Sequence, residues 1–91
     1  MNWLEVIKLR SAGIGSPSLD ELLMSMVQSA QSKLAEIKIY RHAFLNTDLS
    51  VHLYWNSERP EQNGSAPGLR LAQALKDFGL VDHSVWIGIE K

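Results

Sequence analysis

Hydrophobic and polar positions alternate most clearly in residues 49–57, LSVHLYWNS. One alternate set is apolar and is typical of a strand that packs one face on a core: Leu49, Val51, Leu53 and Trp55. The other set carries no charge, although a strand face in water usually does: Ser50, His52, Tyr54 and Asn56. This second face therefore needs an explanation.

The same pattern predicts three further strands, over residues 3–9, 37–45 and 84–89, besides the strand over 49–55. A helix is expected after Ser18, which forms a capping box with Glu21 and precedes an apolar stripe made of Leu19, Leu22, Leu23, Met26, Val27 and Ala30. Ser65 is expected to cap a second helix, with Pro67 in its first turn and a stripe made of Leu71, Ala74, Leu75 and Phe78. Gly79 is predicted to form a left-handed C-cap, with Leu80 packing back on the last turn.

The predicted order is β-α-β-β-α-β, which indicates an α+β, ferredoxin-like fold. Two amphipathic helices then cover one face of a four-stranded antiparallel sheet. With 91 residues, the chain is expected to form a single domain over residues 1–91.

The second and third strands are predicted to form a hairpin with a loop at residues 46–48. This register places His42 opposite His52 and Tyr40 opposite Tyr54, with Arg41 as a misfit on the apolar side. The face away from the helices then combines residues of three strands: Tyr40, His42, His52, Tyr54 and Trp86. The first strand adds either Trp3, Glu5 and Ile7 or Leu4, Val6 and Lys8, because the pattern does not fix its phase.

An aromatic sheet face of this kind usually marks an interface or a ligand site. We expect a second copy to cover it, so that a homodimer encloses a cavity lined by aromatic and histidine side chains. In such a cavity His42 and His52 are candidates for general acid–base catalysis, with Tyr54 donating to a developing oxyanion and Tyr40 and Trp86 contacting the ligand. No metal is expected, because only Glu5, if the phase of the first strand allows it, or an exogenous group could join the two histidines as a third ligand, and no cofactor is required.

Composition and charge exclude several classes of function. The formal net charge is -1 and the pI is about 6.3, so binding to nucleic acid or to an anionic membrane is not expected. The absence of cysteine excludes disulfides and thiol chemistry. No signal peptide or membrane-spanning stretch is recognised, and a cytoplasmic location is expected. Asp82, His83 and Ser84 are triad residue types, but neighbours on an extended chain point to alternate sides and cannot form a relay together.

The element order and the half-polar open face resemble those of the dimeric α+β barrel superfamily, which includes antibiotic-biosynthesis-type monooxygenases and stress-responsive barrel proteins. The segment GSAPGLRLAQALKDFGLVDHSVWI is also similar to that of a family of small uncharacterised bacterial proteins. In the haem-degrading branch an Asn, a Trp and a His act together. Asn2, Trp55 and His83 occur here in that order but without matching spacing, so these roles are not transferred.

The resemblance implies a homodimeric barrel that binds or transforms a small organic ligand. The alternative is a non-catalytic module whose open face joins copies or another protein. Fold membership alone does not decide between the two.

Overall fold

The computed structural model describes residues 2–11, 21–25, 34–45, 47–56 and 64–89. Four strands and one helix are bounded as follows: β1 Asn2–Ser11, β2 Leu34–Arg41, β3 Asp48–Asn56, α2 Ala66–Leu75 and β4 Gly79–Ile87. Residues 21–25 are also helical. They contain part of the first predicted helix, whereas its cap at Ser18 and the remaining stripe positions lie outside the described residues. No helix in the described part is long and apolar enough to cross a bilayer.

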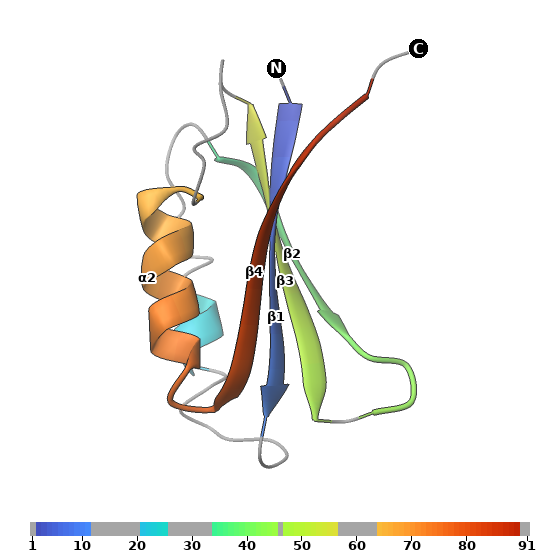
Figure 1. Cartoon of the computed structure of the whole chain (residues 1–91), viewed down its shortest axis with the longest axis vertical. Coiled ribbons are helices and arrows are strands. Elements are labelled where there is room, and N and C mark those ends of the chain that lie inside the picture. Colours follow the sequence, from blue (N-terminus) through green and yellow to red (C-terminus); the bar gives the residue numbers. More distant parts are fainter. Residues whose placement is uncertain (1, 12–20, 26–33, 46, 57–63, 90–91) are drawn as a thin grey trace.

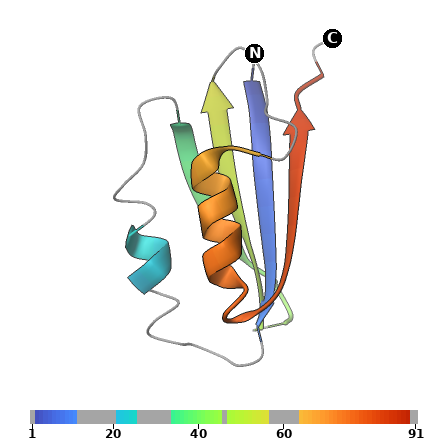
Figure 2. The ribbon, with the colours of Figure 1, turned by 60° about the vertical axis from the view of Figure 1, so that its left-hand side comes forward.

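The strands form one antiparallel sheet in the order β2-β3-β1-β4. The central strand β1 pairs with both β3 and β4. Helix α2 lies along one face of the sheet, and the helical residues 21–25 lie on the same side (Figures 1 and 2). The predicted ferredoxin-like α+β fold is therefore confirmed.

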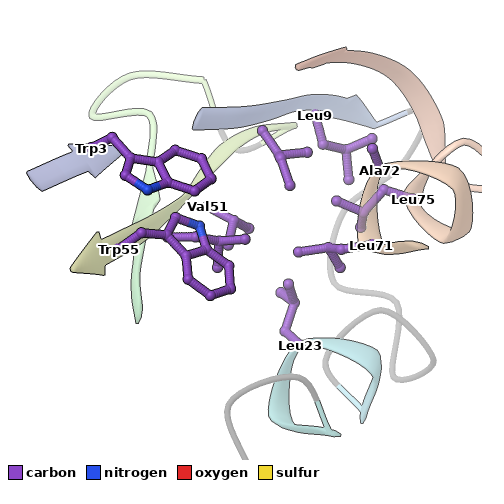
Figure 3. Close-up of a cluster of buried hydrophobic side chains, with 10 residues drawn as sticks. Trp3, Leu9, Leu23, Val51, Trp55, Leu71, Ala72 and Leu75 are labelled. Carbon is purple, nitrogen blue, oxygen red and sulfur yellow. The ribbon is translucent and has the colours of Figure 1, made fainter. Parts of the chain in front are cut away.

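The core lies between this sheet face and the helices, and it is built by alternate residues of each strand. The β1–β3 register pairs Trp3 with Trp55 and Ile7 with Val51, so both sets point toward α2. Leu71 and Leu75 of α2 and Leu23 of the other helical segment pack against them (Figure 3). The apolar face predicted for β3 is confirmed by the burial of Val51, Leu53 and Trp55. The phase of β1 is now fixed, with Leu4, Val6 and Lys8 on the face opposite the helices.

The predicted hairpin register is wrong. In the structure Ile39 pairs with Val51 and Arg41 with Leu49, a shift of four residues from the predicted partners. Strand β2 ends at Arg41, and His42 Nδ1 accepts hydrogen bonds from the backbone N–H groups of Phe44 and Leu45, at 3.1 Å each. Because a side chain satisfies these donors, the ladder stops and a loop longer than residues 46–48 connects the strands. His42 consequently does not face His52, and Lys38 takes that position.

The two ends of α2 differ in how well they were predicted. Ser65 is the N-cap, as predicted, and its Oγ accepts a hydrogen bond of 3.0 Å from Gly68 N. The predicted left-handed C-cap at Gly79 is wrong, because the positive-φ glycine of the described residues is Gly64. Gly79 instead begins β4, where a Cβ would overlap the carbonyl oxygen of Arg10.

Two apolar residues at the borders of β4 also differ from expectation. Leu80, predicted to pack back on α2, is 75% exposed. Ile89 lies beyond the end of β4 and is 90% exposed, although it was predicted to face the helices. Strand β4 thus begins and ends earlier than the alternating pattern indicated.

Candidate functional site

The sheet face opposite α2, here called the open face, carries most of the predicted site residues. The register places Tyr40 of β2, His52 and Tyr54 of β3 and Trp86 of β4 on this side. These four side chains occupy the strand positions that alternate with the core residues. The open face also carries charged side chains that the β3 pattern does not reveal, contributed by the neighbouring strands: Lys8, Glu36, Lys38 and Asp82.

His52 lies at the centre of an aromatic cluster on this face. The Tyr40 ring meets it edge-on with centroids 4.8 Å apart, and the Tyr54 ring centroid is 6.3 Å away. His52 Nε2 is 2.7 Å from Ser50 Oγ. Burial, with a smaller contribution from the positive charge of Lys8, lowers the pKa of His52 below its ordinary value of 6.5. The imidazole is therefore neutral at pH 7.

Trp86 extends the aromatic surface to the other edge of the sheet. Its indole Nε1 donates to Ser84 Oγ at 2.8 Å, while the side chain remains 58% exposed. Tyr40, on the opposite edge strand, is 46% exposed. Two large aromatic side chains of the open face, one on each edge strand, are thus exposed to solvent.

A hollow of about 510 Å³ lies at one end of the open face, beside the loop that follows β2. Tyr40 and His42 line it, together with Ser50 of β3. Its charged lining contains three cations and two carboxylates: Lys8, Arg10, Arg41, Asp48 and Asp82. Among these, Arg10 Nε and Asp48 Oδ2 form an ion pair at 3.4 Å.

The predicted site residues therefore fall into two groups. Tyr40 and His42 border the hollow, whereas His52, Tyr54 and Trp86 lie on the open face outside its lining. The acceptor role of His42 Nδ1 toward two backbone N–H groups places the proton of its neutral form on Nε2. Within the described residues, no three metal-ligating side chains come together.

A second polar cluster, which was not predicted from the sequence, lies on the other side of the sheet. Glu5 is fully buried beside the N-terminus of α2. Its Oε1 accepts hydrogen bonds from Trp55 Nε1 at 2.8 Å and from Ser65 N at 3.0 Å. Its Oε2 is 2.7 Å from His83 Nε2. One carboxylate thus links three strands to the start of a helix.

The strand registers explain why these groups meet. Glu5 lies between Leu53 of β3 and Val85 of β4, on the side that faces α2, and His83 lies two residues before Val85 on that same side. Gly64 and Gly68 leave room for the cluster, because a Cβ at either position would overlap Glu5. Two signals were available in the sequence: a Glu inside the apolar set Trp3, Ile7 and Leu9, and a His in phase with Val85.

Comparisons with known proteins identify the fold. No protein-family model and no curated protein matches the sequence. Among solved structures, SnoaB from Streptomyces nogalater, a cofactor-independent oxygenase, is similar with a TM-score of 0.69 at 11% identity, covering 99% of this chain and 95% of that chain. A SnoaB variant gives a TM-score of 0.70 with the same identity and coverage. A formyltetrahydrofolate deformylase from Pseudomonas putida KT2440 has a TM-score of 0.51 at 10% identity, covering 97% of this chain but 29% of that chain.

At these identities the similarity concerns the fold. The chain shares the ferredoxin-like arrangement of SnoaB over nearly the whole length of both proteins.

Proposed function

We propose that the protein is a homodimer that binds and transforms a small organic ligand at its open face. Two copies pack these faces against each other, so that the hollow of each becomes part of an enclosed cavity. The ligand is a planar aromatic compound with an anionic group. The observation that carries this proposal is the hollow of about 510 Å³ beside the exposed aromatic residues of the sheet.

The size and lining of the hollow favour a ligand of this class. Its volume lies in the range of small-molecule sites, about 300–1,000 Å³. The Tyr40 ring offers an aromatic wall, and Lys8 supplies a positive charge on the open face. Because Arg10 is paired with Asp48, Lys8 is the cation that an anionic ligand group would meet.

In this proposal His42 is a hydrogen-bond donor to the ligand and His52 is the base. His42 donates from Nε2 to an oxygen of the ligand, because its Nδ1 is occupied by backbone donors. The neutral His52 accepts a proton, and the neighbouring Tyr40 and Tyr54 hydroxyls stabilise the negative charge that forms on the ligand. The fold shared with a cofactor-independent oxygenase supports small-molecule chemistry carried out by side chains alone.

A pair of probes with one ring system and opposite charges tests the ligand class. Naphthoate is expected to raise the melting temperature, since a ligand that binds only the folded state stabilises it, whereas naphthylmethylamine is expected to have no effect. Lys8→Gln should weaken the naphthoate effect at least several-fold. Lys38→Gln is the matched control, because Lys38 lies on the open face outside the hollow. Equal stabilisation by both probes, or by neither, would contradict the proposal.

A second candidate function is a non-catalytic interaction module. It is favoured by the large exposed apolar side chains at the same end of the sheet, Phe44 at 90% and Leu80 at 75% exposure. A dimer that binds neither probe would support this alternative.

A further inference from the structure

We propose that Glu5 and His83 form an acid–base pair, in which His83 Nδ1 removes a proton from a weakly acidic small molecule beside the N-terminus of α2. The substrate class is a carbon or oxygen acid whose conjugate base carries an oxyanion, such as an enol or a phenol. This site lies on the opposite side of the sheet from the hollow and does not depend on the dimer.

The hydrogen bonds around Glu5 determine which nitrogen of His83 carries the proton. Two N–H groups, from Trp55 and Ser65, already donate to Oε1. An ionised carboxylate can only accept hydrogen bonds, so His83 Nε2 must donate to Oε2 at 2.7 Å. The neutral imidazole then has its lone pair on Nδ1.

Nδ1 is the atom that is available for chemistry. Glu5 is the hydrogen-bond partner of His83, and it binds Nε2. No buried side-chain nitrogen or oxygen of the described residues lacks a hydrogen-bond partner. Nδ1 must therefore reach solvent, in agreement with the 14% exposure of the His83 side chain. A buried carboxylate thus orients an imidazole whose free nitrogen can meet a ligand.

The pair can accept the proton and stabilise the charge that the transfer creates. The Nδ1 lone pair takes the proton, and the electrons of the broken C–H or O–H bond remain on the ligand as an enolate or phenolate. The positive charge formed on the imidazole is stabilised by Glu5, and the partial positive charge of the α2 N-terminus favours the oxyanion. The proton is returned to the product or passes to water.

Glycine at position 64 allows the backbone to lie close to the pair. A Cβ at Gly64 would lie 2.7 Å from His83 Nε2 and 2.6 Å from Glu5 Oε2. Gly64 also has a φ of 94°, a backbone conformation that residues other than glycine rarely adopt. Both features place the backbone of residues 64–65 directly against the pair, so the turn before α2 fixes its geometry.

Nitrobenzisoxazole is a direct probe of this proposal. A base removes its ring proton, the C–H electrons form a nitrile, and the N–O bond breaks to release a coloured phenolate. His83→Gln removes the base, but its amide can still donate to Glu5. We expect the protein-catalysed rate to fall about 100-fold, within the range of general-base contributions. Asp77→Asn, at an exposed carboxylate after α2, is the control and should leave the rate unchanged.

Nitrogen-15 NMR of the histidine rings tests the pair without a substrate. The wild type should show His83 as the Nε2–H tautomer. Glu5→Gln should reverse it to Nδ1–H, because the Gln amide presents its oxygen to the two N–H donors and its NH₂ group to Nε2. An Nδ1–H tautomer in the wild type, no catalysed elimination, or an unchanged rate in His83→Gln would each overturn the proposal. Naphthoate binding should be unchanged in His83→Gln, which separates this site from the hollow.

Discussion

Glu5 shows how one charged residue can occupy a core position when three N–H groups donate to its carboxylate oxygens. The alternation of β1 places it between Trp3 and Ile7, on the side buried by α2. Burying an unpaired carboxylate would be far too costly, but here the indole, backbone and imidazole nitrogens replace water. The residue therefore specifies how β1, β3, β4 and α2 come together.

Replacing Glu5 by Leu tests this role. The three nitrogens would lose their acceptor in a buried site, so we expect the free energy of unfolding to fall by about 3–5 kcal/mol. Urea denaturation followed by tryptophan fluorescence measures the change. Glu36→Leu, at an exposed position of β2, is the matched control and should change stability by less than about 0.5 kcal/mol. Similar effects of the two substitutions would show that the cluster is not stabilising.

His52 gives a prediction about pH. Its pKa is lowered in the folded protein by burial and by Lys8, so the unfolded chain binds the proton more readily. The unfolded state then holds more protons, and stability is lost as the pH falls through and below 6.5. We expect His52→Gln to be less sensitive to acid than the wild type between about pH 8 and about pH 5. Parallel pH profiles of the two proteins in thermal denaturation would contradict this expectation.

The sequence revealed individual residues best where one position depends on its immediate neighbours. Ser65 was predicted as a cap because capping needs only a hydroxyl that lies a few residues before the backbone N–H group from which it accepts a hydrogen bond. Glu5 and His83 are 78 residues apart, and their meeting depends on the β1–β4 register. The strand pattern does not encode that register, so the cluster was missed.

At the level of elements, the hairpin shows why faces were easier to predict than partners. The observed β2–β3 register differs from the predicted one by four residues. An even shift keeps every side chain on its original face, so Tyr40, His52 and Tyr54 remained on the open face. The loop length was wrong because Ala43 and Leu45 extend the apolar alternation, whereas the His42 side chain ends the strand through its own hydrogen bonds.

Helix α2 offers a prediction in which packing opposes helix propensity. Helix propensity alone should raise the free energy of unfolding of Gly68→Ala by about 1 kcal/mol. A Cβ at this position overlaps the Glu5 carboxylate, so we expect the free energy of unfolding to fall by about 1–3 kcal/mol instead. Chemical denaturation gives the sign directly. Gln73→Ala, exposed on the same helix, should be neutral or slightly stabilising, and a stabilised Gly68→Ala variant would show that the cluster has room to shift.

The whole molecule has two unlike sheet faces. One is closed by α2 and the helical residues 21–25 and contains the hydrophobic core (Figure 3). The Glu5 cluster lies on this same side. None of the helical residues that the structure describes lies on the other face, as Figure 1 shows, yet this face carries Tyr40 and Trp86 in exposed positions. Exposed aromatic surface of this extent is the common mark of an interface, and a two-fold dimer is the commonest closed assembly.

The molar mass in solution tests the central proposal most directly. Light scattering at micromolar concentration should give twice the chain mass of 10.2 kDa for the wild type. Trp86→Lys should give the monomer mass, because a charge would be buried in the interface. Leu69→Lys is the control, since Leu69 is 45% exposed on α2, away from the open face, and it should remain a dimer. A monodisperse wild-type monomer, or a Trp86→Lys variant that dimerises as well as Leu69→Lys, would contradict the account.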